Sequence, residues 1–187
     1  MMEIAIEQVL LWDCGKEYDT VGKIIALTDD DWPKTPFEIA RLGIPAEDRI
    51  RILLKSGIVP KKQLRLLACN FAERTLLHFE AEYPDDKRPR EAIETRRRWV
   101  NGEATDEELA TVRVAVGDAA MVTPKAAAGD AVRAAILDAD GHTPRAAVWH
   151  TARVAAMDAA MAVGRPAAGD VERQYQLEMI MNAVSTV

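Results

Sequence analysis

The residue types that most often carry out chemistry are scattered through this chain rather than grouped. Its three histidines are His78, His142 and His150, and no H-x-x-x-H or H-E-x-x-H pattern joins any of them into the usual zinc-binding helix. Ion pairing on a helix explains His78, turn formation explains His142, and helix packing or a rim contact explains His150. We therefore predict no metal site.

The two cysteines give no better case for covalent catalysis. Cys14 and Cys69 are not in a C-x-x-C pair, and two cysteines are too few for a disulfide framework. Cys69 falls on an apolar helical stripe and has no histidine base nearer than His78, more than two turns away. The sequence also contains no glycine-rich phosphate loop and no G-x-S-x-G elbow. We predict that the protein is not an enzyme, with no catalytic residue and no cofactor.

The densest cluster of charged and conformationally restricted residues is at 83–94 (YPDDKRPREAIE), where two prolines separate two expected helices. Asp85, Asp86, Arg88 and Arg90 have the reach to form charge-assisted hydrogen bonds with one another. The favoured interpretation is that they fix the corner between the helices. The alternative is that the arginines form a fork that binds an acidic partner.

A second candidate for partner binding is the acidic run near the N-terminus. Asp29, Asp30 and Asp31 precede Trp32 in a segment with two prolines, which predicts an exposed loop. Three adjacent carboxylates beside a large aromatic side chain suit a protein that meets a basic surface.

The overall composition agrees with a binding role. The chain has 187 residues, of which 49% are hydrophobic and 29% charged, so one ordinary globular domain with an elaborated end is expected. The formal net charge of -6 argues against binding to duplex nucleic acid, which needs a basic footprint. Acidic proteins are instead attracted to basic partners.

Apolar spacing and helix-terminating residues predict an all-α fold, a multi-helix bundle with an alanine-rich C-terminal helical stack. Prolines and threonine caps begin the expected helices, and Gly57, Gly102 and the break at 164–166 end them. The expected helices lie near residues 4–12, 45–55, 60–83, 88–101, 106–121, 125–139, 145–163 and 169–184. The single weak strand candidate, residues 21–27, reads better as helix or buried loop. Differences in residue pattern divide the chain into an N-terminal extension of mixed helix and loop, 1–44, and a helical domain, 45–187.

The last third of the chain contains so much alanine that its helices would bury little area per residue. Stability should then depend on close helix contacts and on the few large side chains. We expect the core of this region to include Val116, Met121, Ile136, Leu137, Trp149, Met157, Met161, Tyr175, Leu177 and Ile180.

The sequence also bears on location. The first residues lack the basic start and long apolar run of a signal peptide. No stretch approaches the ~20 apolar residues of a membrane span. We expect a cytoplasmic protein that does not contact membranes.

Three segments resemble a known family: residues 66–74 (LLACNFAER), 83–94, and 99–105 (WVNGEAT). They are similar to the immunity proteins of bacterial polymorphic-toxin systems, which also occur in phages and prophages. The alanine-rich tail and residues 170–178 (DVERQYQLE) extend the resemblance over about residues 45–185. The resemblance implies an all-helical domain that binds and neutralises another protein, and it supplies no catalytic residues.

Three hypotheses follow for the function. The first is an inhibitor that binds a toxin or a host defence effector, and a phage-encoded inhibitor of a nucleoprotein defence complex, such as an anti-CRISPR protein, is its most specific alternative. An enzyme using His78 or His142 is the second. The third is a self-associating scaffold, a homodimer through its alanine faces. The residues expected to contact a partner are Asp29, Asp30, Asp31, Trp32, Asp85, Asp86, Arg88 and Arg90.

Overall fold

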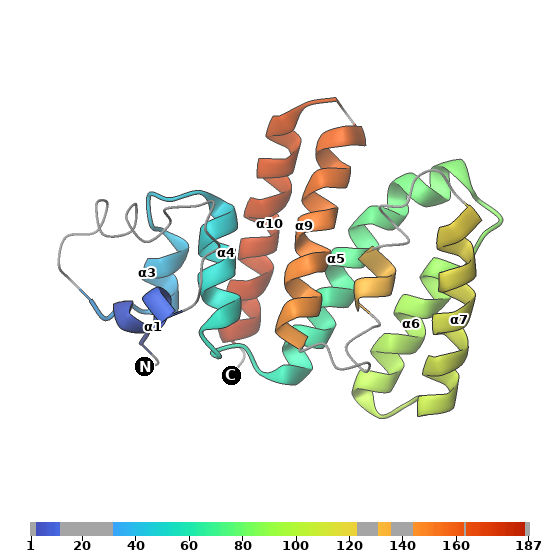
Figure 1. Ribbon diagram of the computed structural model, residues 1–187, viewed down its shortest axis with the longest axis horizontal. Helices are drawn as coiled ribbons and strands as arrows, with labels where there is room; N and C mark the ends of the chain where they lie inside the picture. Colours follow the sequence, from blue (N-terminus) through green and yellow to red (C-terminus); the bar gives the residue numbers. More distant parts are fainter. Residues whose placement is uncertain (1–2, 12–31, 123–130, 136–143, 163, 186–187) are drawn as a thin grey trace. The chain divides into compact units, whose positions relative to one another are not determined.

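The computed structural model describes residues 3–11, 32–122, 131–135, 144–162 and 164–185, with the side chains of 10–11 and 117–122 excepted. These residues are almost entirely α-helical (Figure 1). Their one β feature is an isolated antiparallel bridge between Ile4 and Lys34. The all-α prediction is confirmed. The helices are α1 (Ile6–Leu11), α3 (Pro36–Ala40), α4 (Ala46–Lys55), α5 (Lys61–Glu82), α6 (Arg88–Asn101), α7 (Asp106–Val122), α9 (Pro144–Ala162) and α10 (Pro166–Ser185).

The chain divides into two compact units. Unit 1 comprises Met1–Pro60 and Arg173–Val187, and unit 2 comprises Lys61–Glu172. The division falls inside α10, whose first residues belong to unit 2 and whose remainder belongs to unit 1. A functional boundary between residues 44 and 45 stays a prediction.

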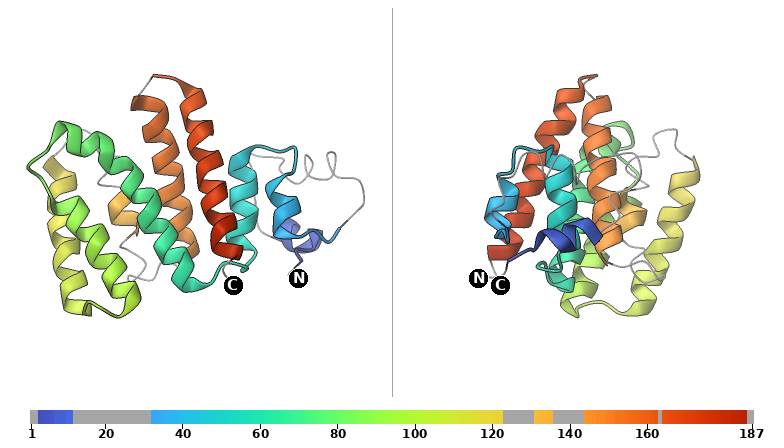
Figure 2. Two further views of the ribbon diagram at one scale, coloured as in Figure 1. Left: turned by 180° about the vertical axis from the view of Figure 1, so that it is seen from behind. Right: turned by 60° about the vertical axis from the view of Figure 1, so that its left-hand side comes forward.

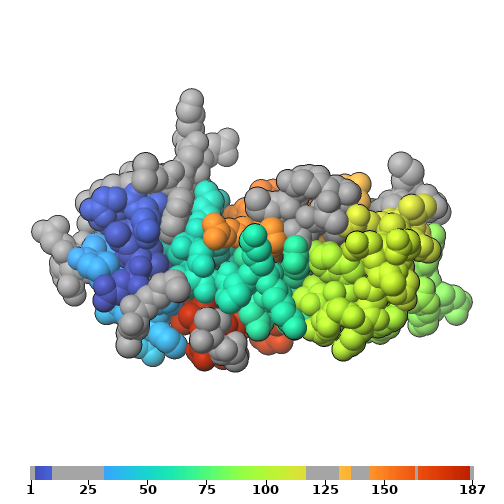
Figure 3. All heavy atoms as spheres, turned by 90° about the horizontal axis from the view of Figure 1, so that it is seen from below, coloured from blue at the N-terminus to red at the C-terminus, as the bar shows by residue number. Residues whose placement is uncertain are grey.

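Unit 2 is organised around its longest helix, α5. α9 packs on α5, α6 also packs on α5, and α7 packs on α6. The views in Figure 2 show α6 beside α5 and α7 beside α6. Seen from below, the side chains of α6 and α7 form one continuous surface (Figure 3). α5 is thus enclosed from two directions by helices that come later in the sequence.

The contact between α5 and α9 combines large side chains with small ones. α5 contributes Leu64, Leu67, Phe71, Leu76 and Phe79 among its buried residues. The buried face of α9 is made of smaller residues, Ala147, Val148, Thr151, Ala152, Ala155 and Ala156. Small residues on one helix let the bulky side chains of the other fill the space between them. The expected use of alanine for close packing is therefore correct for α9.

The expected large core residues of the tail are only partly in the core. Val116, Leu177 and Ile180 are buried as expected, and Trp149 is half-buried. Met157, Met161 and Tyr175 are instead exposed, so that part of the prediction is wrong. The helical register of α9 explains the two methionines, because the alanines already occupy its inward face. Met121, Ile136 and Leu137 lie outside the residues whose side chains are described.

Two helices end as their glycines predict. Gly102 after α6 and Gly164 after α9 have φ angles of 79° and 62°, a conformation that L side chains rarely adopt. The amide of Gly102 donates to Trp99 and the next amide donates to Arg98. The amides of Gly164 and Arg165 repeat the pattern with Met161 and Ala160. These are Schellman motifs, which satisfy the last carbonyls of each helix.

Threonine caps begin two of the helices, one as the sequence predicted and one that it did not indicate. The Glu108 amide donates to Thr105 Oγ1 at 3.1 Å, and the Thr105 amide donates to Glu108 Oε2 at 2.8 Å, which is the expected capping box of α7. An equivalent box joins Thr35 and Glu38 at α3. That segment reads as loop in the sequence because it contains two prolines, but Pro36 occupies the first turn, where proline is tolerated.

Unit 1 holds α1, α3 and α4 around an aliphatic core that includes Ile4, Ile39, Ile50 and Leu53. α3 packs on α4, and Arg49 of α4 donates to the carbonyl oxygen of Ala40 at 2.8 Å. α4 begins at Ala46 after Pro45 and carries acids in its first turn and Lys55 in its last, as predicted. Residues 12–31, with the strand candidate at 21–27, lie outside the described residues. Within the described part of the chain, no helix is long and apolar enough to cross a membrane.

Candidate functional site

In the described part of the chain, the most extensive set of contacts between polar side chains lies between α5 and α6, and its members share a simple spacing. Glu73 and Glu80 are seven residues apart on α5, and Arg90 and Arg97 are seven residues apart on α6. Seven residues is about two helical turns, so each pair occupies one face of its helix. Two acids on one helix then meet two arginines on the other. We call these four residues, with Asn70, the α5–α6 network.

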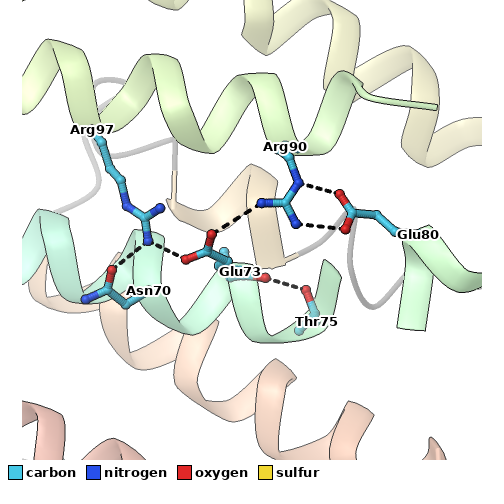
Figure 4. Close-up of polar contacts among 7 residues, drawn as sticks. Asn70, Glu73, Thr75, Glu80, Arg90 and Arg97 are labelled. Carbon is cyan, nitrogen blue, oxygen red and sulfur yellow. Dashed lines mark hydrogen bonds and ion pairs between the residues drawn. The ribbon is translucent and has the colours of Figure 1, made fainter. Parts of the chain in front are cut away.

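At one end of the network, Arg97 binds two groups of α5. Its Nη2 donates to Asn70 Oδ1 at 2.7 Å and to Glu73 Oε2 at 2.6 Å (Figure 4). The Asn70 amide therefore has its oxygen toward the arginine. One guanidinium nitrogen thus holds two residues that are almost one turn apart.

At the other end, Arg90 binds Glu80 through two parallel hydrogen bonds. Nε donates to Oε1 at 2.6 Å and Nη2 donates to Oε2 at 2.7 Å (Figure 4). Its third nitrogen, Nη1, lies 3.4 Å from Glu73 Oε1. Glu73 therefore receives one arginine on each carboxylate oxygen and joins the two ends into one chain of charges. Bidentate geometry of this kind is stronger and more directional than a single-point ion pair.

The charges in the network favour one another's ionised forms. A hydrogen bond from Arg97 lowers the pKa of Glu73, and a hydrogen bond from Arg90 lowers the pKa of Glu80. The same bonds raise the pKa of both arginines. All four groups are thus held charged at neutral pH. The arginines are occupied by carboxylates of their own chain, so the network serves to fix α5 against α6.

A smaller arginine–carboxylate contact joins the loop between α5 and α6 to the start of α6. Arg88 Nε and Nη2 donate to the two oxygens of Asp86 at 2.8 and 2.6 Å, and the Arg88 amide donates to Oδ1 at 3.2 Å. The hydrogen bond from the Arg88 side chain lowers the pKa of Asp86. Asp86 thus orders the first residue of α6.

The four predicted residues of the 83–94 cluster therefore have different surroundings. Asp86 and Arg88 contact each other, whereas Arg90 reaches back to α5. Asp85 is exposed. The contacts of Asp86, Arg88 and Arg90 agree with the favoured interpretation, in which ion pairs fix the corner between the two helices. A role of these residues in partner binding stays a prediction.

Sequence reasoning missed an aromatic site at the other end of α6. The guanidinium groups of Arg65 and Arg96 lie 5.1 and 4.5 Å from the centre of the Trp99 ring. The indole nitrogen of Trp99 donates to Asp106 Oδ1 at 2.6 Å. Arg96 is completely buried. The three-residue spacing of Arg96 and Trp99 on one helix was a usable signal, because such residues are neighbours on the helix surface.

Two further contacts between polar side chains join α5 to distant parts of unit 2. His78 Nδ1 lies 2.7 Å from Asp158 Oδ2 of α9. Arg74 Nε lies 2.8 and 2.6 Å from the two oxygens of Glu172, a buried residue in α10. The spacing of His78 with Arg74 and Glu82 on α5 suggested pairing within the helix, but the observed partners are 80 and 98 residues away.

The remaining candidates for chemistry have clear surroundings. Cys69 is fully buried, and this burial raises the pKa of its thiol to about 11, which agrees with a packing role. His150 is exposed on α9, and His142 lies outside the described residues. In the part of the chain that the structure covers, no three side chains of histidine, cysteine, aspartate or glutamate are grouped as a metal site would require.

The N-terminal candidates are only partly described. Trp32 is half-buried, and Lys34 Nζ lies 5.6 Å from the centre of its ring. Asp29, Asp30 and Asp31 lie outside the described residues. Their expected role in binding a basic surface therefore stays a prediction.

Comparison with known families places the chain beside immunity proteins. The family model described as "Imm-5 like putative immunity protein" matches residues 55–183, well over half of the chain. The match includes all of α5, α6, α7 and α9, and therefore every residue of the α5–α6 network. Among curated proteins and solved structures, none matches the chain.

Proposed function

The chain belongs to the Imm-5 like putative immunity protein family, and on that premise we propose that it neutralises a bacterial toxin by binding it directly. The match over residues 55–183 is the observation that carries this proposal. Inhibition would come from occupation of the toxin surface, without chemistry by the immunity protein itself. We place this binding in the cytoplasm, where a toxin would act on the cell that produces it.

The construction of unit 2 supports a binding role. The α5–α6 network and the pairs of α5 with Asp158 and Glu172 hold the helices in one arrangement before any partner arrives. A surface that is ordered in the free protein loses less conformational entropy on association, and this favours tight binding. Tight binding is what a toxin inhibitor needs.

The residues that would contact the toxin divide into two groups. Asp29, Asp30, Asp31 and Trp32 precede the family-matched region, so we propose that the extension of residues 1–44 adapts the protein to its own toxin. Asp85, which is exposed, and its neighbours Asp86, Arg88 and Arg90 belong to the helical domain that we place at 45–187. In that domain they would provide the part of the surface that family members share.

A second candidate function is supported by the charge of the chain. The formal net charge is -6, and an acidic protein can occupy a basic channel that otherwise binds nucleic acid. The corresponding partner is a nucleoprotein defence effector, and the protein would then be a phage-encoded inhibitor such as an anti-CRISPR protein. The two candidates differ in the protein that binds, so one experiment separates them.

Co-expression with the protein encoded beside its gene tests the proposal. We expect the neighbouring toxin to arrest growth when expressed alone, and we expect this chain to restore growth and to form a stoichiometric complex in isothermal titration calorimetry. A toxin that remains active and shows no heat of binding would refute the proposal. Binding to a purified nucleoprotein effector instead, with restored phage growth, would favour the second candidate.

A further inference from the structure

The exposed face of α9 carries large apolar side chains beside basic ones. Met157 and Met161 have 49% and 64% of their surface exposed. His150 and Arg153 are also exposed. At about 100° per residue the four positions fall within an arc of about 80° and extend over about 16 Å of helix. We call them the α9 stripe.

Charge on α9 is distributed unevenly. Its one acid, Asp158, is turned toward α5 and pairs with His78. On the stripe itself, Arg153 has no ion-pair partner in the described part of the chain, and no carboxylate accompanies it. A chain with a net charge of -6 thus presents an exposed face that combines apolar side chains with positive charge.

We propose that the α9 stripe is a docking surface for a protein segment in which carboxylates flank an apolar face, an acidic amphipathic helix. The assignment rests on the proposed function, because it names the chemistry of one surface of the partner. Methionine is flexible and polarisable, so it adapts to an apolar surface, and arginine binds carboxylates at interfaces more often than lysine does.

Charge complementarity decides among the occupants. A second copy of this chain would bring the same stripe, with the same sign of charge, against itself in a two-fold interface. A membrane would require more than two large apolar side chains, because interfacial helices carry a broad apolar face and several cations. A partner helix with carboxylates beside an apolar face matches the stripe: its apolar face would contact the methionines, and its carboxylates would bind Arg153.

Binding to defined peptides tests the proposal. The probes are a synthetic amphipathic helix with leucines on one face and glutamates beside them, and a twin with lysines in place of the glutamates. Fluorescence anisotropy at low salt should show binding of the glutamate peptide alone. Arg153→Glu, and separately the double variant Met157→Ala/Met161→Ala, should weaken that binding about tenfold. These side chains are exposed, so circular dichroism should show unchanged folding.

Matched controls separate the stripe from general effects. Lys62→Glu makes the same change in net charge at an exposed site on α5, and Val114→Ala removes a side chain with 68% of its surface exposed on α7. Both variants should bind the peptide like the wild type. Equal binding of the two peptides, no binding of the glutamate peptide, or unchanged binding by the stripe variants would each overturn the proposal.

Four further outcomes are distinguishable. Dimers that dissociate in the stripe variants would overturn the proposal in favour of a second copy. Stripe-dependent binding to phosphatidylglycerol vesicles without binding to the glutamate peptide would overturn it in favour of a membrane. A neighbouring toxin that binds wild type and stripe variants equally would refute the stripe and leave the proposed function intact. A toxin that fails to bind while the peptide results hold would refute only the proposed function.

Discussion

Glu73 lies between two arginines of the facing helix, with its Oε2 2.6 Å from Arg97 Nη2 and its Oε1 3.4 Å from Arg90 Nη1. One carboxylate of α5 therefore fixes two positions of α6 that are seven residues apart. The carboxylate is about one-third exposed, so water moderates the strength of both contacts. Directional contacts of this kind set the register of two helices in a way that apolar packing does not.

Replacing the shared carboxylate should destabilise unit 2. We expect Glu73→Gln to lower the free energy of unfolding by about 1–2 kcal/mol, because two guanidinium groups lose their charged acceptor. Urea titration followed by circular dichroism measures the change. Glu103→Gln, at an exposed site after α6 in unit 2, is the control and should change it by less than about 0.5 kcal/mol.

The double variant Glu73→Gln/Arg97→Ala tests whether the two residues stabilise the protein through their contact with each other. If the two residues act through their mutual contact, their combined cost should be smaller than the sum of the single costs by about 1 kcal/mol. Strictly additive costs would show that each residue acts independently, contrary to the observed geometry.

The lowered carboxyl pKa values predict the direction of the pH dependence. Arginine hydrogen bonds lower the pKa of Glu73, Glu80 and Asp86 in the folded state. The unfolded chain therefore binds protons at a higher pH than the folded chain does. Stability from these groups is complete above the ordinary pKa of glutamate, about 4.3, and is lost as the pH falls through the lower folded values.

Urea midpoints at pH 7 and near pH 3 measure this effect. The difference in midpoint between wild type and Glu73→Gln should be largest at pH 7 and should shrink in acid, because protonation of Glu73 then removes the same charge as the substitution. A difference that grows as the pH falls would contradict the assigned direction of the pKa shift.

The Cys69 thiol should be unreactive in the folded protein. It is completely buried and its pKa is raised to about 11, so little thiolate is present or accessible at pH 8. In a Cys14→Ser background, Cys69 is the remaining thiol, and its reaction with an aromatic disulfide reagent can be followed by absorbance. We expect reaction only after unfolding in urea. Rapid reaction of the folded protein would show that α5 exposes this position.

Replacing Asp29, Asp30 and Asp31 together by serine tests their proposed role in partner binding. If the three charges steer association with a basic surface of the toxin, the variant should associate with the toxin more slowly than the wild type at low salt. This difference in association rate constant should vanish at high salt. Stopped-flow or surface plasmon resonance measurements would show this. An unchanged rate at low salt would remove the three residues from the binding surface.

Local signals in the sequence predicted much of the helical framework. Thr105 with Glu108 marks the start of α7, and Gly102 marks the end of α6, because capping and left-handed backbone depend on neighbouring residues. The cap at Thr35 follows the same rule and was missed because the prolines around it read as loop. Helix ends are therefore largely a local property of this chain.

The contacts between helices were less predictable, because they depend on which faces meet. The partner of His78 is 80 residues away, and nothing in the spacing on α5 indicates Asp158. Arg90 and Arg97 were visible as part of a charged cluster, but the acids they bind could not be read without the register of α5 against α6. The exposure of Met157 and Met161 likewise depends on which face of α9 the alanines occupy.

The bond between Arg74 and Glu172 has a consequence for how the protein is made. A ribosome releases α5 long before it has synthesised α9 or the start of α10, so the apolar face of α5 is initially covered only in part, by α6. Contacts that span 98 residues raise the contact order and slow this closing step. The nascent chain should therefore assemble the three helices α5, α6 and α7 first and complete unit 2 only after α9 and the start of α10 have been synthesised.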